Sequence, residues 1–187
     1  MKQLFCALLL VINLHSLLGQ TNELKKIDTD ASTFIKNNSG EKGLVIFFLD
    51  PECPMCQKYT YTINKLSKEN SELNNLNFIG VFSGKGINES TISDYIKRYK
   101  IQFPAFLDTG FIVSDFLAAK VTPEVFLLDE NEVIFYRGMI DNWYYMLGKR
   151  RNKPTENYLE ENIKSLLSRQ AAKYPSNKPF GCIISRL

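Results

Sequence analysis

An unbroken apolar segment followed closely by two cysteines most constrains the fold of this chain. Six apolar residues, Leu44–Leu49, end three residues before the tetrapeptide Cys53-Pro54-Met55-Cys56. A short apolar run bounded by turn residues predicts a strand buried on both faces. Proline suits the first position of a helix, where its missing N–H would be unpaired anyway. The sequence therefore predicts a strand, a short turn and a helix that begins at the first cysteine.

This placement predicts a pair of redox cysteines. At the start of a helix, Cys53 meets free backbone N–H groups and the positive end of the helix dipole, and both stabilise a thiolate. Cys56 lies one turn later on the same face and can close a disulfide with Cys53. We interpret the pair as a dithiol/disulfide switch.

The cysteine pair has three other possible interpretations. A zinc site needs a second pair of ligands, but only one more cysteine, Cys182, follows. A structural disulfide that closes four residues constrains the unfolded chain little. Two buried and unreactive cysteines remain as the third alternative, which the predicted strand, turn and helix disfavour.

The first nineteen residues are typical of a removable export signal. Lys2 precedes an almost unbroken apolar stretch over residues 4–14, and small residues follow before Gln20. An uncleaved anchor is the alternative, but the apolar stretch is shorter than the ~20 residues of a membrane span. We expect residues 1–19 to be a signal peptide, residues 20–173 one domain, and residues 174–187 a tail that carries Cys182. The mature protein would then be soluble, in a periplasm or outside the cell.

Signal removal and charge limit the chemistry. The chain has four cysteines and one histidine, and Cys6 and His15 lie in the signal, so three cysteines and no histidine remain. Serine–histidine triads and histidine-dependent copper sites are therefore excluded. The formal net charge of +3 implies no strong field for nucleic acid. We expect a monomer without a cofactor or a resident metal, in an oxidising compartment.

Alternating strands and helices follow the cysteine pair. Apolar spacing and turn residues predict helices at 54 to about 68, 88–99, near 112–117 and 155–173, with Asn88 or Ser90 and Thr155 as candidate caps. Strands are expected at 77–82, 104–107, 125–128 and 132–136. The alternation indicates right-handed crossovers and parallel pairing at the centre of a sheet.

The pattern resembles the thioredoxin-like superfamily over residues 43–173, and within it the exported redoxins, the group with TlpA-like thiol-disulfide oxidoreductases and peroxiredoxin-like (AhpC/TSA-like) proteins. Three segments carry the resemblance: Val45–Cys56, Phe103-Pro104-Ala105-Phe106-Leu107-Asp108, and Val121–Asp129. The resemblance implies an α/β thioredoxin-like fold, with a central mixed sheet flanked by helices in a single domain. The ending Lys178–Ile184 is similar to the glycine–cysteine tail of some exported redoxins.

The resemblance also implies roles for particular residues. Pro123 is the expected cis-proline facing the cysteines, so the catalytic set would be Cys53, Cys56 and Pro123. The backbone of Thr122 would pair with an extended substrate chain and align its disulfide with Cys53. Pro54 and Met55 would also contact substrate, and Glu52 and Cys182 are possible modulators.

The chain departs from its relatives at three positions. Thioredoxin has a buried aspartate where this chain has Phe47, so Glu52, Asp50 or water would have to accept the proton of the second cysteine. Peroxiredoxins have threonine or serine where Asp50 stands, and proline where Ile46 stands. These two departures argue against efficient peroxidase chemistry.

The leading hypothesis is an enzyme that reduces or exchanges protein disulfides through Cys53 and Cys56. Such a reductase in an oxidising compartment requires an electron donor, which we expect to be a membrane protein. One alternative is a peroxide-reducing redoxin in which a Cys53 sulfenic acid is resolved by Cys56 or Cys182. A non-enzymatic alternative is Cu(I) binding by the three thiolates.

Overall fold

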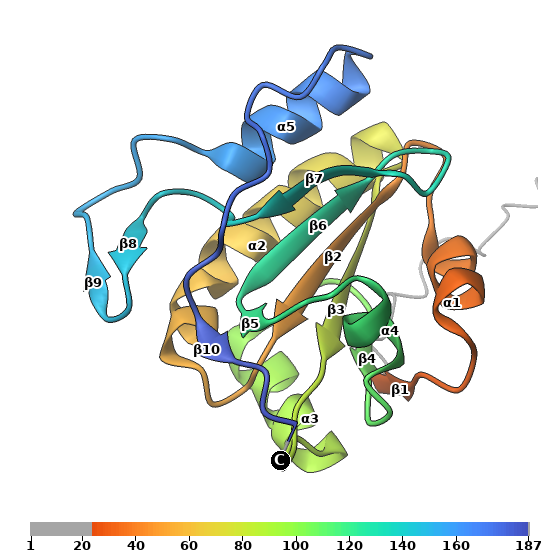
Figure 1. The fold of residues 1–187 in the computed structure, drawn as a ribbon, viewed down its shortest axis with the longest axis vertical. Coiled ribbons are helices and arrows are strands. Elements are labelled where there is room, and N and C mark those ends of the chain that lie inside the picture. Colours follow the sequence, from red (N-terminus) through yellow and green to blue (C-terminus); the bar gives the residue numbers. More distant parts are fainter. Residues whose placement is uncertain (1–23, 187) are drawn as a thin grey trace, which may run out of the picture.

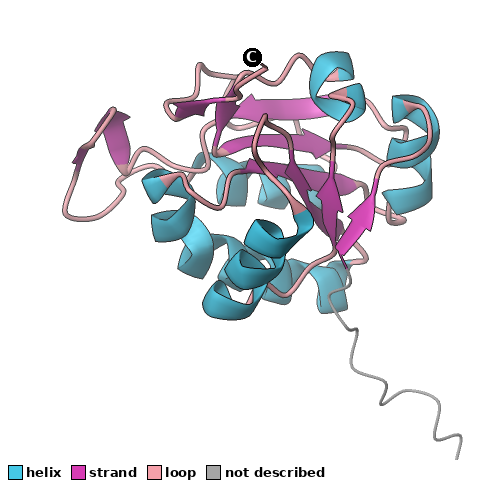
Figure 2. Ribbon diagram, turned by 90° about the horizontal axis from the view of Figure 1, so that it is seen from below, coloured by secondary structure: helices cyan, strands magenta, loops and turns pink. Residues whose placement is uncertain are grey.

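The computed structural model describes residues 24–186 as a six-stranded sheet with helices on both faces (Figures 1 and 2). The sheet has the order β1-β4-β3-β2-β6-β7. Its strands are β1 (Leu24–Lys26), β2 (Leu44–Leu49), β3 (Asn77–Phe82), β4 (Ala105–Leu107), β6 (Glu124–Leu128) and β7 (Ile134–Gly138). The helices are α1 (Ala31–Asn38), α2 (Pro54–Asn74), α3 (Glu89–Tyr99), α4 (Ile112–Phe116) and α5 (Tyr158–Leu167). Two short antiparallel pairs complete the fold: β5 (Val121–Thr122) with β10 (Cys182–Ile183), and β8 (Tyr144–Met146) with β9 (Lys149–Arg150).

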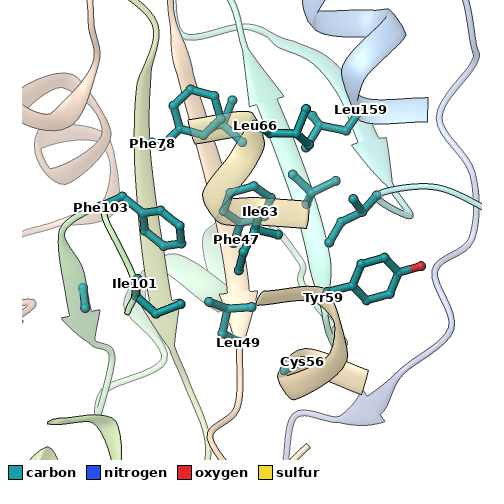
Figure 3. Packing of buried hydrophobic residues seen from close by; sticks show 14 of the residues in the cluster. Phe47, Leu49, Cys56, Tyr59, Ile63, Leu66, Phe78, Ile101, Phe103 and Leu159 are labelled. Carbon is teal, nitrogen blue, oxygen red and sulfur yellow. The ribbon is translucent and has the colours of Figure 1, made fainter. Parts of the chain in front are cut away.

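Strand β2 occupies the centre of the sheet. It pairs parallel with β3 and antiparallel with β6, and all six of its residues are buried. Because side chains alternate along a strand, Val45, Phe47 and Leu49 join one apolar cluster while the residues between them join the other. Residues of α2, α3 and α5 complete the first cluster, part of which Figure 3 shows. Residues of α1 and α4 complete the second. The mixed α/β fold with a central sheet between helices is therefore confirmed.

Several predicted elements are confirmed, with small shifts at their ends. Strands β2 and β3 have the predicted bounds, and α3 begins after Asn88, whose side chain accepts a hydrogen bond from the N–H of Thr91. The second hairpin strand begins at Ile134 rather than at residue 132, because Glu132 has a φ of 65° and belongs to the turn. Strand β4 begins one residue later than predicted, and β6 one residue earlier.

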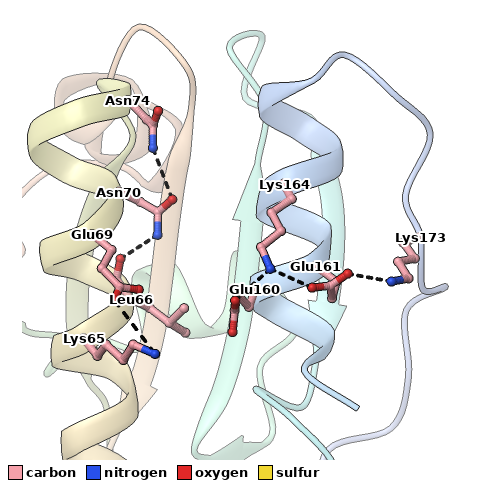
Figure 4. A network of polar contacts seen from close by, with 9 residues as sticks. All are labelled: Lys65, Leu66, Glu69, Asn70, Asn74, Glu160, Glu161, Lys164 and Lys173. Carbon is pink, nitrogen blue, oxygen red and sulfur yellow. Dashed lines mark hydrogen bonds and ion pairs between the residues drawn. The ribbon is translucent and has the colours of Figure 1, made fainter.

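Two predicted helix lengths are wrong. Helix α2 continues to Asn74 and ends at Asn75, whose φ is 51°, instead of ending near residue 68. Within this added length, the Asn74 side chain donates a hydrogen bond to the side chain of Asn70, one turn earlier (Figure 4). Helix α5 covers Tyr158–Leu167 instead of 155–173.

The ends of α5 show why its length was overestimated. Thr155, the predicted cap, hydrogen bonds with the side chain of Asn142 through both its N–H and its hydroxyl. Asn157 takes the cap position without a side-chain hydrogen bond. At the other end, Arg169 has a φ of 54°, which turns the chain out of the helix. Lys173 then lies outside the helix and pairs with Glu161 (Figure 4).

Part of the sequence-based account lies outside the described residues. The predicted signal peptide, residues 1–19, is among the residues that the structure does not describe. Elements β1 and α1 were not predicted. Between residues 24 and 186, no helix is both long and apolar enough to cross a membrane.

A buried carboxylate fixes the loop that leads into β6. Glu124 is 1% exposed, and its Oε2 accepts a hydrogen bond of 2.9 Å from the N–H of Lys120. Its Oε1 lies 3.0 Å from Nη2 of Arg137, which also donates to the carbonyl oxygen of Ala118. A buried charge is tolerated when it is paired and hydrogen-bonded in this way. Glu124 and Arg137 thus hold the β5 loop against β7.

We predict that Arg137→Met lowers the free energy of unfolding by about 2–3 kcal/mol, because it leaves the Glu124 carboxylate buried without its cation. The value lies below the ~3–5 kcal/mol typical of a fully buried pair, since the Arg137 side chain is 34% exposed. Denaturant unfolding of the oxidised protein measures the difference. Arg98→Met, at an exposed position of α3, is the control and should change stability by less than about 0.5 kcal/mol. Equal stabilities of the two variants would contradict the account.

Candidate active site

Cys53 lies at the end of the turn that joins β2 to α2. It is the N-cap residue of α2, Pro54 is at the first helical position, and the N–H of Cys53 donates to the carbonyl oxygen of Asp50 over 3.2 Å. Cys53 is 2% exposed and Met55 4%, whereas Pro54 is exposed. The predicted strand, turn and helix are confirmed, with the first cysteine at the helix start.

The loop before β6 reaches this cysteine from the neighbouring strand. The Thr122–Pro123 peptide bond is cis, as the resemblance implied. The Sγ of Cys53 lies 3.2 Å from the carbonyl oxygen of Thr122, although 69 residues separate the two in sequence. The structure therefore brings together Cys53, Thr122 and Pro123, as the sequence-based site required.

The disulfide partner of Cys53 differs from the predicted one. Cys53 is bonded to Cys182, 129 residues away, with a Cα–Cα distance of 6.1 Å. Cys56 remains a free thiol. The reason lies in the tail, because β10 pairs antiparallel with β5 and places Cys182 directly opposite Thr122 (Figure 1). Cys182 thus belongs to the site itself, a place that the sequence left undecided.

Cys56, which lies three residues after Cys53 in α2, is fully buried. Its burial raises the pKa of the Cys56 thiol to about 12, although a hydrogen bond with the Asp50 backbone lowers this pKa more than the Asp50 charge raises it. The side chain of Thr122 lowers this pKa to a lesser extent. Phe47 lies in the apolar cluster that also contains Cys56 (Figure 3). Of the two carboxylates considered as its proton acceptor, Asp50 is the one whose charge acts on Cys56, while Glu52 is exposed to solvent.

A small recess beside the cysteines contains an acidic residue that the sequence analysis missed. Met55, Tyr59, Pro123, Asp141 and Phe180 are among its lining residues. The Asp141 carboxylate accepts hydrogen bonds from the Tyr59 hydroxyl, at 2.5 Å, and from the N–H of Trp143. Burial raises the pKa of Asp141, and these two hydrogen bonds oppose the rise. No motif in the sequence marks Tyr59 or Asp141 as part of the site.

Comparison with known proteins identifies the family. The sequence profile of the family described as Redoxin matches residues 19–142. The chain belongs to the redoxin family. The matched region contains Cys53, Cys56, Thr122 and Pro123, and it ends before the tail with Cys182. A search of curated proteins gives no match.

Solved structures agree on the fold of this redoxin. An uncharacterized conserved protein from Geobacillus kaustophilus has a TM-score of 0.72 and 18% identity, with 81% of each chain covered. A hypothetical protein from Sinorhizobium meliloti has a TM-score of 0.69 and 20% identity, covering 83% of this chain and 87% of its own. A putative thioredoxin from Neisseria meningitidis has a TM-score of 0.54 and 18% identity, covering 73% and 79%. The thioredoxin-like fold is confirmed.

We predict that Cys56 stays protonated up to about pH 10 while Cys53 and Cys182 are bonded, because its pKa is raised well above the ~8.5 of an exposed thiol. The pH dependence of the Cys56 ¹³Cβ chemical shift in selectively labelled protein measures this. The same labelled protein in denaturant should titrate near pH 8.5 and is the control. A folded-state midpoint below about pH 9 would contradict the burial argument.

Proposed function

We propose that this redoxin is an exported thiol–disulfide oxidoreductase that reduces or exchanges disulfides of protein substrates. The observation that carries the proposal is the short distance between the Sγ of Cys53, at the N-terminus of α2, and the carbonyl oxygen of Thr122. This distance is 3.2 Å. A cysteine that approaches along the β5 edge is thereby held against the Sγ of Cys53, as Cys182 is. Membership of the redoxin family supports the same chemistry.

The proposed reaction has two steps. The Cys53 thiolate attacks a substrate disulfide, forms a mixed disulfide, and releases one substrate sulfur as a thiolate that takes up a proton. Cys56 then loses its proton and attacks the Sγ of Cys53, which releases the second substrate thiol and leaves a Cys53–Cys56 disulfide. The high pKa of Cys56 keeps it protonated until this step, so proton removal by water or by Asp50 limits the rate of release.

The charges around Cys53 act on its thiolate in opposite directions. The helix N-terminus favours its thiolate, whereas the negative charge of Glu52 beside it opposes the thiolate, weakly because Glu52 is exposed. Because a dithiol with a less stable thiolate is more reducing, Glu52 makes this pair more reducing than it would be without that charge. A reductase in the oxidising compartment implied by residues 1–19 needs a partner that carries electrons outward, and we assign that role to a membrane protein.

A thiol peroxidase is the second candidate, and the Cys53–Cys182 bond favours it specifically. In that reaction hydrogen peroxide oxidises Cys53 to a sulfenic acid, water leaves, and a second cysteine forms the disulfide. Against it stand Asp50 and Ile46, at positions where peroxiredoxins have hydroxyl and proline residues. Cu(I) binding has less support, because the described residues bring together no group of three or more Cys, His, Asp or Glu side chains suited to a metal.

We predict that Cys56→Ser, combined with Cys182→Ser, traps mixed disulfides between Cys53 and substrate proteins. Without either resolving thiol, the intermediate of the first step cannot be released within the molecule. The measurement is non-reducing electrophoresis and mass spectrometry after incubation with disulfide-bonded model proteins. Cys53→Ser in the same background is the control and should trap nothing.

The same double variant separates the two candidate functions. Reaction of Cys53 with hydrogen peroxide should be no faster than that of free cysteine if the protein is an exchange catalyst. A peroxide rate at least about a hundredfold above that of free cysteine, with no trapped protein, would assign the peroxidase function instead.

A further inference from the structure

The C-terminal tail is hydrogen-bonded to α5 and to the end of β7. Tyr174 exchanges two hydrogen bonds of 3.1 Å with the side chain of Asn162 on α5. Asn177 then donates to the carbonyl oxygen of Arg137 and accepts from the N–H of Met139. Figure 1 shows this segment passing over β7 toward β5. The tail is therefore positioned before it reaches the cysteines.

At the site the tail continues as a strand. The pairing of β10 with β5 places Cys182 opposite Thr122 and Ile183 opposite Val121. The N–H of Ile184 donates to the carbonyl oxygen of Lys120 over 2.9 Å, and the Ile184 side chain is 5% exposed within the second apolar cluster. Cys182 is thus held between contacts on both sides.

Gly181, the residue before Cys182, lies too close to the β5 backbone for any side chain. A Cβ on Gly181 would lie 2.2 Å from the carbonyl oxygen of Thr122, a distance that no side chain tolerates. Phe180, one residue earlier, lines the recess with Met55 and Pro123. The tail therefore meets the same backbone and the same side chains that the proposed function assigns to a substrate.

We propose that tail residues 180–184 are a tethered substrate. Cys182 is then a third redox-active residue, which alternates with Cys56 as the disulfide partner of Cys53. This rests on the proposed function, since it uses the same nucleophile and the same β5 edge. An external substrate must displace β10 before it pairs with β5. The tail also indicates the class of substrate: an extended segment with glycine directly before its cysteine and an apolar residue before that.

The exchange needs no external oxidant or reductant. The Cys56 thiol loses its proton and attacks the Sγ of Cys53, the Cys53–Cys182 bond breaks, and Cys182 leaves as a thiolate that takes up a proton. One disulfide and one thiol are present before and after the step. A tether keeps Cys182 at a high effective concentration near Cys53, so both bonded forms are populated and a free substrate competes with the tail.

The first test maps disulfides in the oxidised mature protein after acid quenching, alkylation and proteolysis. The proposal expects both the Cys53–Cys182 and the Cys53–Cys56 forms in the wild type. Gly181→Val should lower the ratio of the Cys53–Cys182 form to the other at least about tenfold, because its side chain clashes with Thr122. Ala172→Val, at an exposed position outside residues 180–184, is the control and should leave the ratio unchanged.

The outcomes separate this proposal from the proposed function. Finding the Cys53–Cys56 form alone in the wild type overturns the tethered tail and leaves the exchange catalyst standing. Finding the Cys53–Cys182 form alone overturns the exchange with Cys56. If Cys182→Ser then also lacks a reversible Cys53–Cys56 pair, the proposed function is overturned as well.

A second test probes the substrate class directly with a peptide of residues 178–185, its cysteine activated as a mixed disulfide. The protein is the full mature chain with Cys56→Ser and Cys182→Ser, so that Cys53 alone can react. The peptide should react at least about tenfold faster than the same peptide with valine in place of the glycine. Equal rates would overturn the assigned substrate class. A failure of Cys53 to react even with a small aromatic disulfide would overturn the proposed function instead.

Discussion

The junction between β2 and α2 is the constraint on which the rest of the site depends. Strand β2 is buried along its whole length between β3 and β6, so its end is fixed in space. The turn after it places Cys53 at the first free N–H groups of α2 and beside Thr122 on the neighbouring loop. The Cys53 sulfur, the N-terminus of a helix and the edge of β5 meet there because the buried strand β2 ends at that point.

The tail uses this arrangement rather than adding a separate one. By pairing with β5, it occupies the strand edge that an incoming substrate would need, and its cysteine takes the position of a substrate cysteine. Cys56 is buried and protonated, and its attack on Cys53 then determines which disulfide partner Cys53 keeps. The Cys53–Cys182 disulfide and the Cys53–Cys56 disulfide expected from the sequence are therefore two states of Cys53 under the proposed account.

Local patterns in the sequence predicted what local physics determines. The apolar run Leu44–Leu49 predicted β2, the proline after Cys53 predicted the start of α2, and one of the two candidate caps, Asn88, proved to be the cap of α3. The family resemblance supplied the cis bond before Pro123, which spacing alone does not reveal. The partner of Cys53 could not be predicted, because it depends on the pairing of β10 with β5, which brings together two cysteines that lie 129 residues apart. The paired Tyr59 and Asp141 likewise meet only through the fold, 82 residues apart.

The most direct measurement is a count of free thiols in the mature wild-type protein equilibrated across a series of thiol/disulfide buffers, by alkylation and intact-mass spectrometry. The account predicts one reversible two-electron transition, in which three free thiols fall to one as Cys53 takes either partner. Three free thiols in every buffer, or an oxidation that no thiol buffer reverses, would contradict the claim that Cys53 exchanges disulfides.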